Sequence, residues 1–200
     1  MNTKAVSSPM KKLTGLLLTI AASALISLPV LAQNYYSSAI FNPRRNSTSR
    51  SVDGTIAGEF DAAIKYYQNF QTFADAVNQA GLMEQFRSSN SRGAVEYTVF
   101  VPTDAAFAAL PEATRKELFK PKNKEKLLKL LNYHIVPGAV SNEEVAEGMV
   151  ETVSGDRITI NLDAIEDKIT LNESSTIESS QRAKNGVIIL VDEVLIPEEL

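Results

Sequence analysis

The residue best suited to acid–base or metal chemistry is His134, because it is the only histidine and the chain has no cysteine. A neutral imidazole can act as a general base, a metal ligand or a buried hydrogen-bonding group. A Ser–His–Asp triad needs a nucleophile on a strained turn beside the base, and the sequence contains no G-x-S-x-G pattern. A zinc site needs three or four His, Cys or carboxylate ligands, and no acidic residue adjoins His134 in the sequence.

The sequence around His134 favours a structural role for this side chain. His134 lies between a leucine-rich segment and the turn at Pro137, so we predict that it is buried where a helix gives way to a strand. A buried imidazole needs a hydrogen-bond partner. We expect this partner to be Asp104, or a backbone group near the helix start at Thr103 and Asp104.

No other motif indicates a cofactor. The sequence contains neither a glycine-rich phosphate loop nor an EF-hand calcium loop. The acidic residues Asp163, Glu166 and Asp167 could bind a cation loosely, but a solvated loop is the simpler interpretation. We therefore predict that the protein binds no metal ion and no cofactor.

The first 32 residues are typical of a signal peptide. Three lysines precede an apolar run over residues 13–28, and Val30 and Ala32 occupy the small-residue positions of a cleavage site after Ala32. The alternative is an uncleaved anchor, since the run is only slightly shorter than the roughly 20 residues that span a bilayer. We predict cleavage and export, with no membrane span in the mature chain because no second apolar segment follows.

Charge and composition of the remaining chain argue against nucleic-acid binding. Residues 1–32 contain three Lys and no acidic residue, so their removal changes the net charge from −4 to −7. Neutralising phosphates requires clustered Lys and Arg, and the basic stretch 120–129 is interpreted as the solvated face of a helix.

Residues 33–58 are rich in Ser, Asn, Arg and Gly without apolar periodicity, which predicts a flexible linker that is dispensable for folding.

From residue 59 onward the sequence has the periodicities of regular secondary structure, and we predict one domain over residues 59–200. Apolar residues at helical spacing predict helices, and Gly81 is a C-terminal stop signal. Thr103 is placed to cap a short helix, and Asp104 in its first turn complements the helix dipole. Helices are expected over residues 60–67, 70–80, 104–110, 112–119 and 123–132, and after a capping box at 141–144.

The last third of the chain changes to the alternation of strands. Residues 149–153, 157–162 and 168–171 alternate apolar and polar side chains, and Gly155-Asp156 predicts a tight hairpin. A strand is also expected over 95–101, and the apolar run 186–197 is typical of a strand buried on both faces. Helices come first and strands follow without βαβ alternation, which predicts an α+β fold.

Three segments stand in the order and at the spacing of the sequence boxes of the fasciclin domain family. They are YTVFVPTDAAFAALP (97–111), LLNYHIVPG (130–138) and NGVIILVDEVLIP (185–197). The chain therefore resembles this family over residues 59–200. The last box often carries a His where this chain has Ile189, so no polar role is expected at that position.

The resemblance implies a wedge of two β-sheets with several helices packed around it. It also implies a non-catalytic, extracellular adhesion or ligand-binding module, in which the Tyr133-His134 segment is associated with adhesion. The motif residues that the resemblance singles out are Thr103, Asp104, Tyr133, His134, Asn185, Gly186 and Asp192.

Three hypotheses for the function follow. The leading one is an exported, non-catalytic binding or adhesion module for a protein or polysaccharide at the cell surface or matrix, with Tyr133 and His134 as candidate binding residues. The alternative is a carrier of a small apolar ligand in a groove between helices and sheet. A hydrolase is retained only because Ser and Asp are plentiful. An apolar pocket would favour the carrier, and an exposed apolar patch without a pocket would favour adhesion. The sequence leaves the oligomeric state open.

Overall fold

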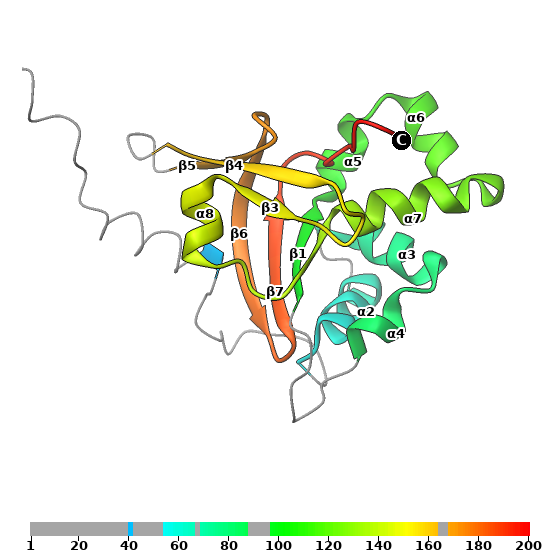
Figure 1. The fold of residues 1–200 in the computed structure, drawn as a ribbon. Coiled ribbons are helices and arrows are strands. Elements are labelled where there is room, and N and C mark those ends of the chain that lie inside the picture. The colour runs from blue at the N-terminus through cyan, green and yellow to red at the C-terminus, as the bar shows by residue number, and fades with distance from the viewer. Residues whose placement is uncertain (1–39, 42–53, 67–68, 88–96, 164–167) are drawn as a thin grey trace, which may run out of the picture.

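The computed structural model describes residues 40–41, 54–66, 69–87, 97–163 and 168–200. These residues form a seven-stranded sheet with most of the helices gathered on one side of it (Figure 1). The predicted signal peptide 1–32 and most of the predicted linker 33–58 lie outside the described residues.

The sheet is antiparallel except for one pair of strands. Its order is β2-β1-β7-β6-β5-β4-β3, and the exception is the parallel pair of β1 and β7, which joins the first strand of the domain to the last. The other neighbours pair antiparallel, including β3 with β4 through the hairpin predicted at Gly155. The strands are β1 (Tyr97–Pro102), β2 (Ile135–Pro137), β3 (Met149–Glu151), β4 (Arg157–Asp163), β5 (Lys168–Leu171), β6 (Ser175–Ala183) and β7 (Gly186–Val191).

Strands β5 and β6 are connected by only two residue pairs, Thr170 with Thr176 and Leu171 with Ser175, and the sheet changes direction between them (Figure 1). In Figure 1, β3 and β4 run across the direction of β1, β6 and β7. The α+β fold and its wedge shape agree with the sequence prediction. The two layers of the wedge are the two halves of one continuous sheet, since every strand is hydrogen-bonded to the next in the order.

Helices α5 and α8 begin at the side-chain caps that the sequence predicted. Thr103 accepts a hydrogen bond from the backbone N–H of Ala106, and the capping box between Ser141 and Glu144 is present with both of its hydrogen bonds. Gly81 and Gly148 end their helices in the left-handed conformation. The helices are α2 (Ile56–Tyr66), α3 (Gln71–Ala80), α4 (Met83–Arg87), α5 (Asp104–Ala109), α6 (Glu112–Leu118), α7 (Lys124–Tyr133) and α8 (Asn142–Glu147), with a 3-10 turn at Pro121–Asn123.

Strand β7 is buried on both faces, as its apolar run predicted, because it separates two hydrophobic cores. Ile188 belongs to the first core, between the sheet and the helices, whereas Val187, Ile189 and Val191 belong to the second core. The second core also takes residues from β3, β4 and β5, so it fills the space between the two halves of the sheet. The strand ends at Val191, however, and residues 192–197 of the predicted run continue without strand structure.

Parts of the predicted linker 33–58 pack into the domain. Helix α2 begins at Ile56, which is fully buried in the first core. Phe41 is only 2% exposed and belongs to the second core. The prediction of an unpacked linker is therefore wrong for these residues. Sequence periodicity could not reveal the contact of Phe41, because a single apolar side chain that fills a gap has no period. Ile56 lies four residues before Phe60 and continues the apolar face of α2, so the helical period could have been extended to it.

Candidate functional site

Asp104 caps a helix and does not contact His134. Its carboxylate accepts hydrogen bonds from the backbone N–H groups of Gln71, at 3.2 Å, and Thr72, at 2.7 Å. These donors lie in the first turn of α3, where N–H groups have no partner within the helix and a negative charge is favourable. Asp104, at the start of α5 and directly after β1, thus fixes the first turn of α3 beside the end of β1.

His134 is fully buried at the end of α7, and both of its ring nitrogens are hydrogen-bonded. Nδ1 lies 2.8 Å from the carbonyl oxygen of Leu130, and Nε2 accepts from the backbone N–H of Leu195 at 3.1 Å. A carbonyl oxygen can only accept and an N–H can only donate, so the proton is on Nδ1 and the ring is neutral. The prediction of Asp104 as the partner is wrong, since the partners are backbone groups of Leu130 and Leu195.

Burial lowers the pKa of His134 to about 4, because a charged imidazolium would lose its hydration, and the hydrogen bond to the Leu130 carbonyl opposes this only in part. The neutral ring also contacts Phe73, with the ring centroids 5.6 Å apart. A fully buried imidazole whose two nitrogens are both hydrogen-bonded has no free polar atom to contact another molecule. His134 therefore cannot serve as the contact residue that the sequence also suggested.

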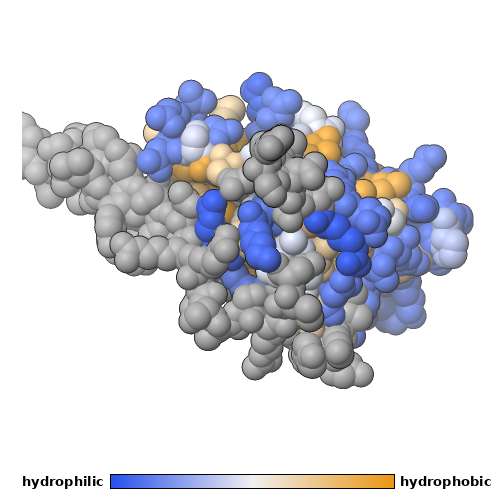
Figure 2. Space-filling model, turned by 90° about the horizontal axis from the view of Figure 1, so that it is seen from below, coloured by the Kyte–Doolittle hydropathy of each residue, from blue (hydrophilic) through white to orange (hydrophobic). Residues whose placement is uncertain are grey.

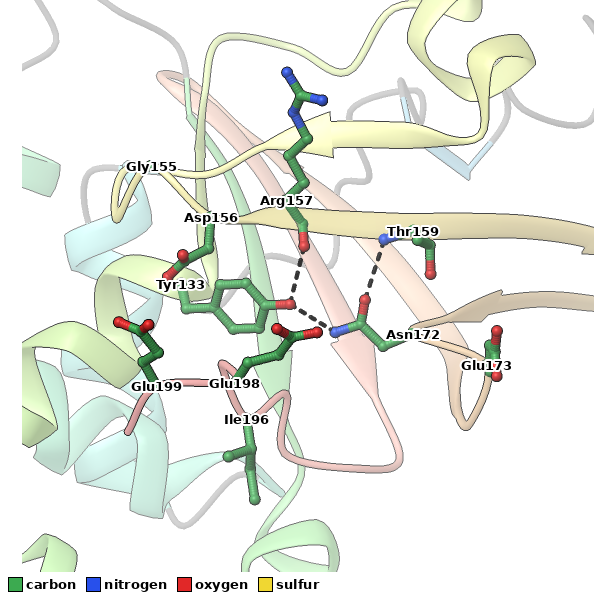
Figure 3. Close-up of a pocket in the computed structure, with 10 residues that line it drawn as sticks. All are labelled: Tyr133, Gly155, Asp156, Arg157, Thr159, Asn172, Glu173, Ile196, Glu198 and Glu199. Carbon is green, nitrogen blue, oxygen red and sulfur yellow. Dashed lines mark hydrogen bonds between the residues drawn. The ribbon is translucent and has the colours of Figure 1, made fainter.

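Tyr133 points the opposite way, toward the β3–β4 hairpin and the end of β5. Its hydroxyl donates to the carbonyl oxygen of Arg157 at 3.0 Å and accepts from the side-chain amide of Asn172 at 2.8 Å (Figure 3). Burial raises the pKa of Tyr133, so its hydroxyl remains a neutral donor near pH 7. The hydroxyl therefore links α7 to β4 and to the β5–β6 turn.

Asn172 is a site residue that the sequence analysis missed. Its side-chain oxygen accepts from the backbone N–H of Thr159, and its own N–H donates to the Thr159 carbonyl oxygen, both at 3.1 Å. Asn172 and Glu173 have φ values of 48° and 66°, and Asn tolerates this left-handed conformation better than most residues. An Asn directly after the alternating segment 168–171 is a turn signal that could have pointed to this position.

An open pocket of about 760 Å³ lies over the Tyr133 hydroxyl network (Figure 3). Its walls come from the β3–β4 hairpin, β4, the β5–β6 turn and the C-terminal segment. Ile196, which is 46% exposed, contributes an apolar surface to this last wall. The described lining residues are Tyr133, Gly155, Asp156, Arg157, Thr159, Asn172, Glu173, Ile196, Glu198 and Glu199.

The lining of the pocket is acidic. Four of its residues carry carboxylates, and Arg157 supplies the basic group among the described lining residues. The Arg157 side chain extends away from the Tyr133 hydroxyl, with a guanidinium nitrogen 3.9 Å from the sulfur of Met149 (Figure 3). The four carboxylates are Asp156, Glu173, Glu198 and Glu199. The pocket thus presents negative charge and a few polar groups around one apolar side chain.

Comparison with known proteins shows the family in which this fold and these motifs occur. Residues 68–197 match the sequence profile of the family described as the fasciclin domain. The chain belongs to the fasciclin domain family. A protein of Synechocystis sp., Protein sll1483, is 37% identical over 130 residues, which cover 65% of this chain and 68% of that protein.

In two other relatives the match covers less than half of the relative's own length. Cell surface glycolipoprotein MPB83 of Mycobacterium bovis is 34% identical over 51% of this chain and 44% of its own, and human periostin is 29% identical over 68% of this chain and 16% of its own. The solved FAS1 domain pair of the insect cell adhesion molecule fasciclin I has a TM-score of 0.50 at 15% identity, covering 72% of this chain and 51% of that one. This last likeness concerns the fold alone.

The remaining motif residues of the fasciclin domain lie away from the pocket. The Asn185 side chain accepts from the N–H of Ile56 at 2.9 Å and donates to the carbonyl oxygen of Phe86 at 2.7 Å, which joins the β6–β7 turn to α2 and α4. The carboxylate of Asp192 accepts from the N–H of Thr176. Gly186 allows the closest approach of β7 to β1, because a Cβ there would lie 2.0 Å from the Tyr97 carbonyl oxygen. Ile189 is buried in the second core.

Among the residues that the structure describes, no group of three or more His, Asp or Glu side chains could hold a metal ion. Nor does any helix described here have the length and apolar character needed to cross a membrane.

Proposed function

We propose that the protein is an exported, non-catalytic binding module that recognises an extracellular or cell-surface protein through the acidic Tyr133 pocket. The observation that carries the proposal is the pocket itself, in which four carboxylates surround a satisfied tyrosine hydroxyl. Family membership supports it, since fasciclin domains occur in a protein named as a cell-surface glycolipoprotein and in one named as a cell adhesion molecule.

The charge of the pocket selects the chemistry of the partner. Carboxylates on the rim attract Lys and Arg side chains, steer their approach and repel acidic surfaces. The exposed methyl groups of Ile196 can pack against the aliphatic part of such a side chain. The partner that fits is a protein that presents a basic side chain, and an amine-bearing polysaccharide is the other outcome that the experiment below distinguishes.

From below the view of Figure 1, the described surface is mostly hydrophilic with scattered apolar residues (Figure 2). The large apolar side chains that are exposed in the described part of the chain are Met149, Val153 and Ile196. A carrier of a small apolar ligand is less well supported, because such ligands occupy pockets with mainly apolar linings. Hydrolysis by a His134 base is not supported, since this ring is fully buried.

The test is binding of the fluorescently labelled mature chain to intact cells of the source organism. The variant Glu173→Gln/Glu198→Gln removes two exposed pocket carboxylates, and Glu143→Gln/Glu147→Gln removes two exposed carboxylates from α8 as a matched control. We expect the pocket variant to lose at least about tenfold in affinity, equivalent to about 1.4 kcal/mol, and the control to bind as the parent chain does. Protease treatment of the cells distinguishes a protein partner from a polysaccharide. Equal binding by both variants would exclude the pocket.

Export is the second part of the proposal, and it rests on the lysines, the apolar run and the Val30–Ala32 site near the N-terminus. N-terminal sequencing of the protein recovered from outside the cytoplasm should begin at Gln33. An intact Met1 on protein in the membrane fraction would contradict cleavage.

A further inference from the structure

The second hydrophobic core includes a residue from outside the family domain. Phe41 is 2% exposed and belongs to this core, although the fasciclin match begins only at residue 68. The other buried members of the core come from α7, from the strands of the domain and from the segments that directly follow β2 and β7. Phe41 therefore comes from a separate segment of the chain, and its side chain is inserted into a core that residues of the domain form.

The neighbouring residue contributes to the same contact. Ile40 packs against the second core, as do the partly buried side chains of Val145, Leu162 and Ile177. These three residues belong to α8, β4 and β6, which are the elements around the side of the wedge away from α2, α3 and α4. Residues 40–41 lie on this α8 side of the molecule (Figure 1). An aliphatic and an aromatic side chain thus enter the wedge together.

We propose that this side of the wedge is a docking groove for a short aliphatic–aromatic segment, and that the chain's own Ile40 and Phe41 occupy it in cis. The groove is specific for an aromatic ring because Phe41 is almost completely enclosed there, and aromatic side chains bury the largest apolar area per residue. The N-terminal segment then acts as an autoinhibitory contact that keeps the groove closed to the same segment of a second copy.

The cis contact can be exchanged for a contact between two molecules, because Ile40 and Phe41 of a second copy fit the same groove. Residues 42–53 join Phe41 to the first described residue of the domain, Gly54. The cis segment therefore binds as part of the same molecule, so an outside segment competes poorly until the cis contact is weakened. The groove lies on another side of the second core from the Tyr133 pocket, and Tyr133 itself belongs to both the pocket lining and this core.

The experiment uses the mature chain and a fluorescent peptide of residues 36–45, whose anisotropy reports binding. We expect the full mature chain with Ile40→Ala/Phe41→Ala to bind the peptide at least about tenfold more tightly than the parent chain does, because its groove is vacated. The same peptide with Phe41→Ala should bind neither the parent chain nor the double variant. The variant Glu173→Gln/Glu198→Gln should behave as the parent chain, which separates this groove from the proposed partner site.

A second variant, Phe41→Leu, guards against loss of the fold, because it keeps an apolar side chain in the core. Circular dichroism checks that each variant is folded before the peptide is added. A folded double variant that does not bind the peptide would overturn the proposal, and so would equal binding by the parent chain. Unfolding of both variants would also overturn it, because residues 40–41 would then be an integral part of the core.

Discussion

The Nε2 atom of His134 accepts a hydrogen bond from the backbone N–H of Leu195, so the only imidazole of the chain ties α7 to the segment that follows β7. This segment continues through Ile196 and Glu198, which form one wall of the Tyr133 pocket. Tyr133 and His134, which are adjacent in one motif, therefore contribute to the pocket from different sides. Tyr133 reaches the floor of the pocket, and His134 holds a wall of the pocket from inside the core.

Replacing His134 by Ala should destabilise the fold by about 2–4 kcal/mol. The change leaves a cavity beside Phe73 and removes the partners of the Leu130 carbonyl and the Leu195 N–H. Urea denaturation followed by circular dichroism measures the free energy of unfolding. A loss below about 0.5 kcal/mol would mean that the ring contributes nothing beyond an ordinary surface residue.

His134 and Asp104 should act independently on stability. Asp104 binds the N–H groups of Gln71 and Thr72, whereas His134 binds backbone groups of Leu130 and Leu195, so the two side chains share no partner. In a double-mutant cycle, His134→Ala and Asp104→Ala should add to within about 0.5 kcal/mol. A coupling energy above about 1 kcal/mol would show that α3 transmits strain between them.

The burial of His134 could be predicted from sequence, but its partners could not. A lone His after a leucine-rich helix, without acidic neighbours, has few interpretations, and burial is one that a local pattern can support. Leu195 is 61 residues away in the chain and offers a backbone N–H, which no side-chain pattern can indicate. The acidic pocket was missed for the same reason, since the β3–β4 hairpin, the β5–β6 turn and the C-terminal segment meet only in the folded domain.

Stability should fall on acidification through the titration of His134. Its pKa is about 4 in the folded protein and 6.5 in the unfolded chain, so between these values only the unfolded chain binds the proton. The free energy of unfolding should therefore drop by about 3 kcal/mol as the pH falls from about 6.5 to about 4, and rise again with pH. Because the chain has one His, the difference between the parent and His134→Gln isolates this effect from the carboxylates. Identical pH profiles for the two proteins would contradict the low pKa.

Gly186 should tolerate no side chain. It has a φ of 154°, and a Cβ there would lie 2.0 Å from the carbonyl oxygen of Tyr97, its partner in the parallel pair of β1 and β7. Gly186→Ala should therefore cost more than about 3 kcal/mol or prevent folding. Gly155→Ala is the control, because its φ is also positive, at 87°, but no atom lies within 4 Å of the added Cβ. It should cost only about 1 kcal/mol, and a similar loss in both variants would refute a steric cause at Gly186.

The elements of the fold that the sequence predicted are those with a strong local signal. The capping box at Ser141, the β3–β4 hairpin and the doubly buried β7 all follow from residue types within a few positions. Strand β6 has the sequence STIESSQRA, without apolar alternation, and it becomes a strand because its backbone pairs along β7. Strand β2 has three residues, too few to show a period. In these two cases tertiary pairing decides the structure.

Removal of the N-terminal segment should destabilise the domain in two steps. A chain that starts at Gly54 lacks Phe41, which fills the second core, and should lose about 2–3 kcal/mol relative to the mature chain from Gln33. A chain that starts at Gly58 also lacks Ile56, which is fully buried and donates its N–H to Asn185, and should lose about 3 kcal/mol more. Each kcal/mol lowers the melting temperature of a domain of this size by about 2–4 °C, so calorimetry resolves the two steps. Equal melting temperatures for all three chains would restore the interpretation of residues 33–58 as a linker, because neither side chain would then contribute to the cores in which it lies.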